Sequence, residues 1–164
     1  MDGTTFMIIY LSIILLLVLF FILKGIIEYK EKLKLMEAIE ELADNSLEVS
    51  PEKLLEMKQA TLKGKKKVSQ KLTDDFVGVY IIYNKTKDMY YVGQAKKVLA
   101  RASQHFTGHG NGDVYADYKY GDEFTIKTIS LNTSGYSSLD RLEKDTIETY
   151  EAFSSGYNKT RGNS

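Results

Sequence analysis

The feature that most constrains this chain is an uncharged, mostly aliphatic run of 21 residues from Gly3 to Leu23. At about 1.5 Å per residue, a helix of that length extends roughly 30 Å, which is the hydrocarbon thickness of a bilayer. The alternative is a cleaved signal peptide, which would begin with Lys or Arg and end at small residues. Here the only early charge is Asp2, and the run ends at Leu23-Lys24 without such a site. We therefore expect residues 1–24 to be a transmembrane anchor in contact with the lipid bilayer.

The charges beside this run predict its orientation. The N-terminal side has only Asp2 and the terminal amine, whereas the C-terminal side has four closely spaced lysines, Lys24, Lys30, Lys32 and Lys34. Short loops rich in Lys and Arg remain on the cytoplasmic side of a membrane. We therefore expect a single-pass membrane protein whose C-terminal domain is cytoplasmic.

Residues 25–70 are expected to form a helical, charged stalk or linker. Apolar residues recur there at helix-like spacings, at Ile26, Leu33, Met36, Ile39 and Leu42. This narrow stripe would allow a homodimer through the stalk, although it is short for a coiled coil. The segment Ser50-Pro51-Glu52 has the pattern of a helix start, and predicts a second helix that ends at about Leu62.

Composition excludes several classes of site. The chain has no cysteine, which excludes a disulfide framework, thiol catalysis and cysteine-ligated zinc. Lys and Arg together number 22 and Asp and Glu number 22, so the formal net charge is zero, which argues against tight non-specific duplex binding. The most basic stretch is Lys63-Gly64-Lys65-Lys66-Lys67. It could bind phosphates or anionic lipid headgroups, or it could be a solvated linker.

From residue 76 onward the pattern predicts an α+β domain with a small three-stranded antiparallel sheet and flanking helices. The apolar, β-rich runs are FVGVYIIY, MYYVG and FTIKTISL, and residues 84–88 between the first two predict a hairpin turn. Alternation places Gly78 and Tyr80 on one face of the first strand, and Tyr91 and Gly93 share a face of the second. Glycine in a strand permits a close approach by a ligand or by backbone. The alternation in the third run changes phase, which predicts a bulge.

A helix expected over residues 96–106 carries Arg101 and His105 at positions i and i+4, on one side. Arginine can bind a phosphate with two parallel hydrogen bonds and stabilise charge during phosphoryl transfer, although a lone arginine is more often a surface ion-pair partner. His105 and His109 have the spacing of a zinc pair, but the glycines around His109 interrupt the helix and no cysteine completes a set. We expect the segment GHGNGD, residues 108–113, to be a flexible loop.

A helix expected over residues 139–151 places Glu143 in the middle of its apolar face. A carboxylate is rarely placed on a buried face unless it is paired, hydrogen-bonded or bound to a cation. Two interpretations stay open on these residues alone, namely an ion pair with Arg101 or a lysine and a metal ligand.

Taken together, these residues resemble the GIY-YIG nuclease family over residues 76–163. Gly78-Val79-Tyr80 is similar to the GIY element and Tyr91-Val92-Gly93 to the YIG element, with Val in place of Ile in both. The other matches follow in the family's order and are the helix arginine Arg101, His105, the metal-binding glutamate Glu143 and the C-terminal asparagine Asn158. We therefore expect residues 71–164 to be a GIY-YIG nuclease domain.

The resemblance implies metal-dependent hydrolysis of a phosphodiester bond. Glu143 would hold one Mg²⁺ or Mn²⁺ ion, and Arg101 would stabilise the phosphate. Tyr80 is the candidate general base, with His105 as the alternative proton acceptor, and Tyr91 would position the water. Gly78, Gly93 and Asn158 would support the site structurally.

The expected function is that of a membrane-anchored endonuclease that acts on DNA. DNA that enters at the membrane is one candidate substrate. RNA is not excluded as a substrate. The alternative is a catalytically inactive, membrane-tethered module that binds nucleic acid or assembles with other proteins.

Overall fold

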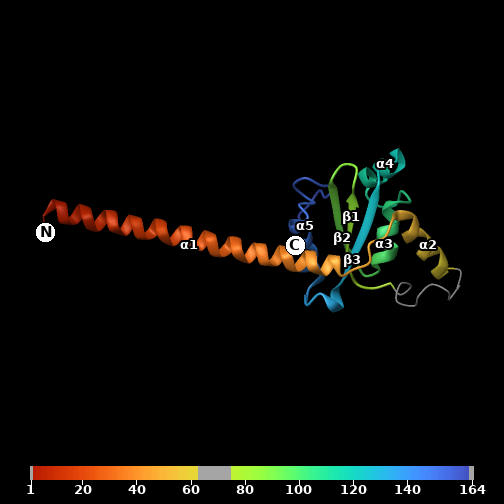
Figure 1. Cartoon of the computed structure of the whole chain (residues 1–164), viewed down its shortest axis with the longest axis horizontal. Coiled ribbons are helices and arrows are strands. Elements are labelled where there is room, and N and C mark those ends of the chain that lie inside the picture. Colours follow the sequence, from red (N-terminus) through yellow and green to blue (C-terminus); the bar gives the residue numbers. More distant parts are fainter. Residues whose placement is uncertain (1, 63–74, 163–164) are drawn as a thin grey trace. The chain divides into compact units, whose positions relative to one another are not determined.

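The computed structural model describes residues 2–62 and 75–162 (Figure 1). The chain divides into two compact units, Met1–Glu37 and Ala38–Ser164. The lysine-rich segment 63–67 and the boundary expected at residue 71 lie outside the described residues. The division of the chain at residues 24 and 70 therefore stays a prediction.

Within the first unit, the apolar run is helical, as part of helix α1, Gly3–Asp44. Its most apolar stretch of 18 residues has a mean hydropathy of 3.2, and none of that stretch is buried. The large apolar side chains from Phe6 to Leu23 are all at least 39 % exposed. Among the described residues, α1 is the helix that is long and apolar enough to cross a membrane.

The second unit is built on a three-stranded antiparallel sheet, which confirms the expected fold class. Strands β1 (Gly78–Asn84), β2 (Met89–Ala95) and β3 (Phe124–Ser130) lie in the order β2-β1-β3. The turn between β1 and β2 is stabilised by Asn84, whose Oδ1 accepts hydrogen bonds from the backbone N–H groups of Thr86 and Lys87 at 2.9 and 3.1 Å. The turn of the hairpin therefore lies where the sequence predicts it, between Asn84 and Met89.

Helices cover both faces of the sheet, and Figure 1 shows α3 and α5 on opposite sides of it. One face, which we call the Tyr80 layer, packs Tyr80 and Ile82 against helices α2 (Pro51–Leu62), α3 (Val98–His105) and α4 (Gly112–Tyr120). The other face, the Val79 layer, packs Val79 and Ile81 against helix α5 (Leu139–Thr149) and the end of α1. A short 3₁₀ helix, η2 (Leu131–Thr133), follows β3.

The predicted bulge in the third strand is wrong. The register of β1 and β3 runs without interruption from Gly78 opposite Ser130 to Asn84 opposite Phe124. The change of phase has another cause, because Ile126 packs in the Tyr80 layer and Ile129 in the Val79 layer. A strand that is covered on both faces does not alternate strictly between apolar and polar residues.

Helix α4 is an element that the sequence did not predict, and it begins inside the expected flexible loop. Its start is capped by Asn111, whose Oδ1 accepts from the N–H groups of Asp113 and Val114 at 2.9 and 3.1 Å. Its end is Gly121, in the left-handed conformation with φ of 100°. Only Val114 of this helix is buried, so α4 has no apolar face that periodicity could reveal.

Two segments expected in the stalk or linker contribute to the core of the second unit. Ile39 and Ala43, at the end of α1, are 0 % exposed in the Val79 layer. Leu54 of α2 is 1 % exposed in the Tyr80 layer, and Val49 pairs with Ile126 of β3. These contacts explain why the compact unit begins at Ala38.

Replacement of Ile39 by alanine tests whether the end of α1 is part of the core. Because Ile39 is fully buried, we expect Ile39→Ala to lower the free energy of unfolding by about 2–4 kcal/mol. Urea unfolding of the full chain in detergent micelles, followed by near-UV circular dichroism, measures this change. The matched control is Glu41→Ala, an exposed position in the same helix, for which we expect a change within about 0.5 kcal/mol. Equal stabilities of the two variants would contradict the assignment.

Candidate active site

The centre of the candidate site is Tyr80, which lies across the backbone of Gly93. Tyr80 and Gly93 are directly opposite each other in the β1–β2 pair, and Tyr80 is 1 % exposed. A Cβ atom at Gly93 would lie 2.6 Å from Cζ of Tyr80 and closer still to its hydroxyl. Gly93, in the triplet Tyr91-Val92-Gly93, therefore leaves the space that is occupied by the ring of Tyr80, in the triplet Gly78-Val79-Tyr80.

Tyr80, Tyr91 and His105 form an aromatic cluster, in which Tyr80 and His105 are buried and Tyr91 is half-buried. The ring centroid of His105 lies 5.4 Å from that of Tyr80 and 4.7 Å from that of Tyr91. Nε2 of His105 is hydrogen-bonded to the hydroxyl of Tyr80 at 3.1 Å, and His105 is 0 % exposed. On its other side, Nδ1 of His105 accepts a hydrogen bond from the backbone N–H of Asn111 at 2.9 Å. Both ring nitrogens are thus occupied within the protein.

Arg101 lies at the exposed rim of this cluster. It is on α3, one turn before His105, and its Nη1 donates to Oε1 of Gln104 at 2.6 Å. Burial raises the pKa values of Tyr80 and Tyr91, and the charge of Arg101 opposes this rise. Burial and the same charge both lower the pKa of His105. The side chain is exposed, so it is accessible to an anionic ligand.

Burial makes the ionised forms of the cluster unfavourable. Desolvation raises the pKa of Tyr80, and the neighbouring Tyr91 raises it further. Desolvation, with a smaller effect of Arg101, lowers the pKa of His105 from 6.5 to about 4. At neutral pH, His105 is therefore an uncharged imidazole and Tyr80 an uncharged phenol.

Glu143 is buried on α5, as its position on the apolar face predicts, with 8 % exposure. Oε1 accepts from the backbone N–H of Gln94 at 3.1 Å, and Oε2 accepts from Nε2 of Gln94 at 3.0 Å. The same Nε2 donates to Asp140 at 2.5 Å, so two carboxylates share one amide. Burial raises the pKa of Tyr91; the charge of Arg101 opposes this rise and the charge of Glu143 adds to it.

The remaining predicted residues shape the strands around the site. Asn158 hydrogen-bonds twice to the backbone of Val92, through Oδ1 and Nδ2, both at 2.8 Å, and so fastens the C-terminal segment to the edge of β2. A Cβ atom at Gly78 would collide with the carbonyl group of Ile129 in β3. Asn158 and Gly78 therefore hold backbone in place, and among the described residues their contacts are with Val92 and Ile129.

Sequence reasoning missed the residues that hold these side chains in position, which are Gln94 and Asp140 beside Glu143 and Gly110 and Asn111 beside His105. Asp140 precedes Glu143 by three positions on one helix, a spacing that could have indicated it. Gly110 and Asn111 lie in the segment expected to be flexible, and a capping asparagine before Asp113 was the available signal.

The low pKa of His105 predicts a pH dependence of stability. Between pH 6.5 and about 4, the unfolded chain binds a proton at His105 that the folded protein does not. The free energy of unfolding is therefore retained above pH 6.5 and falls as the pH drops towards 4, by up to about 3 kcal/mol. Urea unfolding between pH 4 and 7 measures this loss, and His105→Gln should reduce it. The control His109→Gln replaces an exposed histidine and should keep the pH dependence of the wild type. If the free energy of unfolding changes with pH equally in the wild type and in His105→Gln, the assignment to His105 is wrong.

Comparison with known proteins identifies the family. Residues 76–158, just over half of the chain, match the model of the GIY-YIG catalytic domain. The comparisons with curated proteins and with solved structures gave no match. The matched range includes both triplets, Arg101, His105, Glu143 and Asn158. Members of this family are endonucleases, so the domain implies hydrolysis of DNA. The chain therefore belongs to the GIY-YIG family.

Proposed function

We propose that this protein is a membrane-anchored, metal-dependent endonuclease that hydrolyses phosphodiester bonds of DNA. The observation that carries the proposal is the buried Tyr80–His105 pair within reach of the charge of Arg101, inside the residues that match the catalytic domain. A buried hydrogen-bonded tyrosine with a strongly perturbed pKa is typical of a catalytic group.

In this proposal Tyr80 is the general base, and its phenolate takes a proton from the attacking water. The raised pKa of Tyr80 opposes formation of the phenolate, so positive charge must be brought to the site. Arg101 supplies part of that charge, because it lowers the pKa values of both Tyr80 and Tyr91. Tyr91, half-buried beside Tyr80, positions the water or a phosphate oxygen.

Arg101 is the proposed phosphate-binding residue. Its guanidinium is exposed and presents several N–H donors in one plane, which matches the oxygens of a phosphodiester. Donors placed where negative charge develops stabilise the transition state more than the substrate. The bond to Gln104 orients the side chain before substrate arrives.

The residues around Glu143 fit a single divalent cation. Among the described residues, no group of three or more His, Cys, Asp or Glu could enclose a metal. One carboxylate is nevertheless the kind of ligand set that Mg²⁺ accepts, because this ion keeps several waters and binds substrate phosphates. Glu143 would hold the ion, and Gln94 fixes both carboxylate oxygens. When bound, the cation supplies Lewis-acid stabilisation of charge on the phosphate and on the leaving 3′ oxygen.

Two other functions are the alternatives to DNA cleavage. The near-neutral charge of the chain would suit a catalytically inactive binding or assembly module, which would keep the fold without cleavage. An RNA-directed nuclease would use the same residues. Parallel assays with duplex DNA, single-stranded DNA and RNA separate these alternatives from the proposal.

Replacement of Glu143 tests the catalytic proposal. Glu143→Gln keeps the size of the side chain and removes its charge, so we expect cleavage of supercoiled plasmid with Mg²⁺ or Mn²⁺ to fall by about 100-fold or more. DNA binding, measured by fluorescence anisotropy in EDTA so that neither protein cleaves, should change little. The matched control is Glu148→Gln, an exposed position on the same helix.

Two results would count against this assignment of Glu143. Loss of the near-UV circular dichroism signal in Glu143→Gln would favour a buried structural pair. A folded Glu143→Gln protein with the cleavage rate of the wild type would exclude Glu143 as the ligand. Absence of cleavage by the wild type on all three substrates would favour the inactive module.

Removal of residues 2–24 tests the membrane anchor. We expect the full chain to float with membranes and to resist alkaline extraction, whereas the shortened chain should stay soluble, because α1 would lose its apolar run. A C-terminal tag should be protected from protease in intact spheroplasts if the catalytic domain is cytoplasmic. Mass spectrometry controls for processing, since a chain shortened at its N-terminus would indicate a cleaved signal peptide. An anchored nuclease of this orientation would meet DNA that enters at the membrane.

A further inference from the structure

The loop between α3 and α4 determines which nitrogen of His105 carries the proton. The backbone N–H of Asn111 donates to Nδ1 of His105 at 2.9 Å, so Nδ1 is an acceptor and has no proton. In a neutral imidazole the proton then lies on Nε2. Nε2 is the atom that meets the hydroxyl of Tyr80, at 3.1 Å.

We propose that the Gly110–Asn111 turn fixes His105 as the Nε2–H tautomer, so that His105 is a hydrogen-bond donor to the oxygen of Tyr80 and not a proton acceptor. Asn111 is then a positioning residue of the catalytic site, which acts through His105. This inference rests on the proposed function in one respect, namely that it takes Tyr80 to be the general base.

The turn is built to hold this contact. A Cβ atom at Gly110 would lie 2.7 Å from Cα, Cγ and Nδ1 of His105, so a side chain has no room there. Asn111 is fixed by its own side chain, since Oδ1 caps α4 and Nδ2 donates to the carbonyl oxygen of Tyr157 at 3.3 Å. Its backbone N–H is therefore held in one direction by contacts on two elements.

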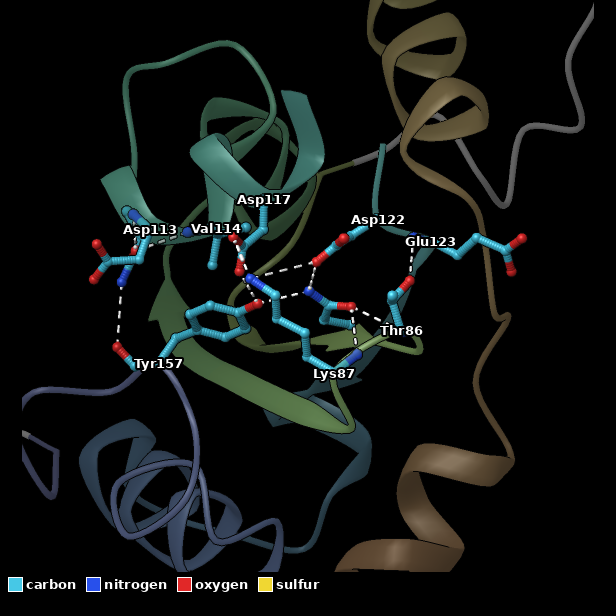
Figure 2. A network of polar contacts seen from close by, with 10 residues as sticks. Thr86, Lys87, Asp113, Val114, Asp117, Asp122, Glu123 and Tyr157 are labelled. Atoms are coloured by element: carbon cyan, nitrogen blue, oxygen red, sulfur yellow. Dashed lines mark hydrogen bonds and ion pairs between the residues drawn. The ribbon is translucent and has the colours of Figure 1, made fainter. Parts of the chain in front are cut away.

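Those two elements are joined to each other and to the hairpin by a polar network (Figure 2). The hydroxyl of Tyr157 donates to Asp117 of α4 at 2.7 Å and accepts from Nδ2 of Asn84 at 2.7 Å. Asp117 also accepts from Nζ of Lys87 at 2.6 Å, and Asn84 donates to Asp122 at 2.7 Å. Asn84 is 0 % exposed, so this network is anchored inside the protein. It fixes the position of Asn111 relative to the sheet that carries Tyr80.

The rings of Tyr80 and His105 then have different chemical roles. A donor aimed at the oxygen of Tyr80 favours the phenolate over the phenol. It also leaves no lone pair on Nε2, so His105 cannot accept the proton that Tyr80 loses when its O–H bond breaks, and a water molecule takes up that proton. Protonation of His105 would place a second N–H on Nδ1, facing the N–H of Asn111. Burial and the charge of Arg101 lower the pKa of His105 to about 4, so the ring is neutral at pH 7, as this tautomer requires.

The tautomer can be measured directly by nitrogen NMR on the ¹⁵N-labelled full chain in detergent micelles. The chain has only two histidines, and His109→Gln leaves the signals of His105 alone. We expect His105 to show a protonated Nε2 and an unprotonated Nδ1 between pH 6 and 8. Asn111→Ala and Gly110→Ala should shift these signals towards a mixture of tautomers, whereas Asn132→Ala, at an exposed position in η2, should not.

Three results of this experiment would overturn the proposal. They are a protonated Nδ1 in the wild type, a doubly protonated ring at pH 7, and wild-type signals in both turn variants.

Measurements of kcat on His105 variants distinguish a hydrogen-bond donor at this position from a general base. The side-chain amide of His105→Gln can place an N–H near the position of Nε2 but cannot take up a proton, whereas the amide of His105→Asn ends near Nδ1. We expect His105→Gln to keep kcat within about tenfold of the wild type, and His105→Asn and His105→Leu to lose about 100-fold or more, with smaller changes in KM. Equal, complete loss in all three variants would identify His105 as a base and overturn the inference. If the wild type cleaves no substrate, the proposed function fails, and the NMR result still decides the tautomer.

Discussion

The site depends on one close approach, in which the Tyr80 ring lies over the backbone of Gly93. That approach requires Tyr80 to stand directly opposite Gly93 in the β1–β2 pair. A shift of register by one residue would send every side chain of a strand to the other face, which would take Tyr80 away from His105. The turn at residues 84–88 prevents such a shift, because Asn84 binds the N–H groups of Thr86 and Lys87. The two triplets are thus parts of a single contact.

Periodicity predicted those features that depend on which residues are apolar. It placed Tyr80 with Ile82 and separated them from Val79, and it found that Glu143 lies on the buried side of its helix. It failed at β3, because it contains no information on whether a second layer will cover the strand. Ile126 and Ile129 both point into cores, and the resulting pattern imitates a bulge.

The features that sequence reasoning missed are held by polar contacts. Helix α4 buries only Val114, and its ends are defined by the cap at Asn111 and by the left-handed Gly121. A segment with three glycines in five residues gives no periodic signal, so residues 108–112 suggested flexibility. In the folded protein Gly110 is required because His105 lies against it. The hydrogen-bond partners of a capping residue become evident only when distant segments such as Tyr157 are in place.

The two sides of the candidate site come from different layers of the protein. Tyr80 and the contacts of His105 belong to the Tyr80 layer, whereas α5, which carries Glu143, packs through Leu142 and Ile147 in the Val79 layer. Ile39 and Ala43 of α1 pack in that same layer.

The geometry around Glu143 therefore depends on residues that precede the matched region by more than thirty positions. A fragment that starts at residue 71 would keep both triplets, Arg101 and Glu143, but it would lack Ile39, Ala43 and Leu54. Loss of these buried side chains would weaken both layers. The unit that can hold the site together is the compact one that begins at Ala38, in which the end of α1 contributes Ile39 and Ala43 to the core against which α5 packs.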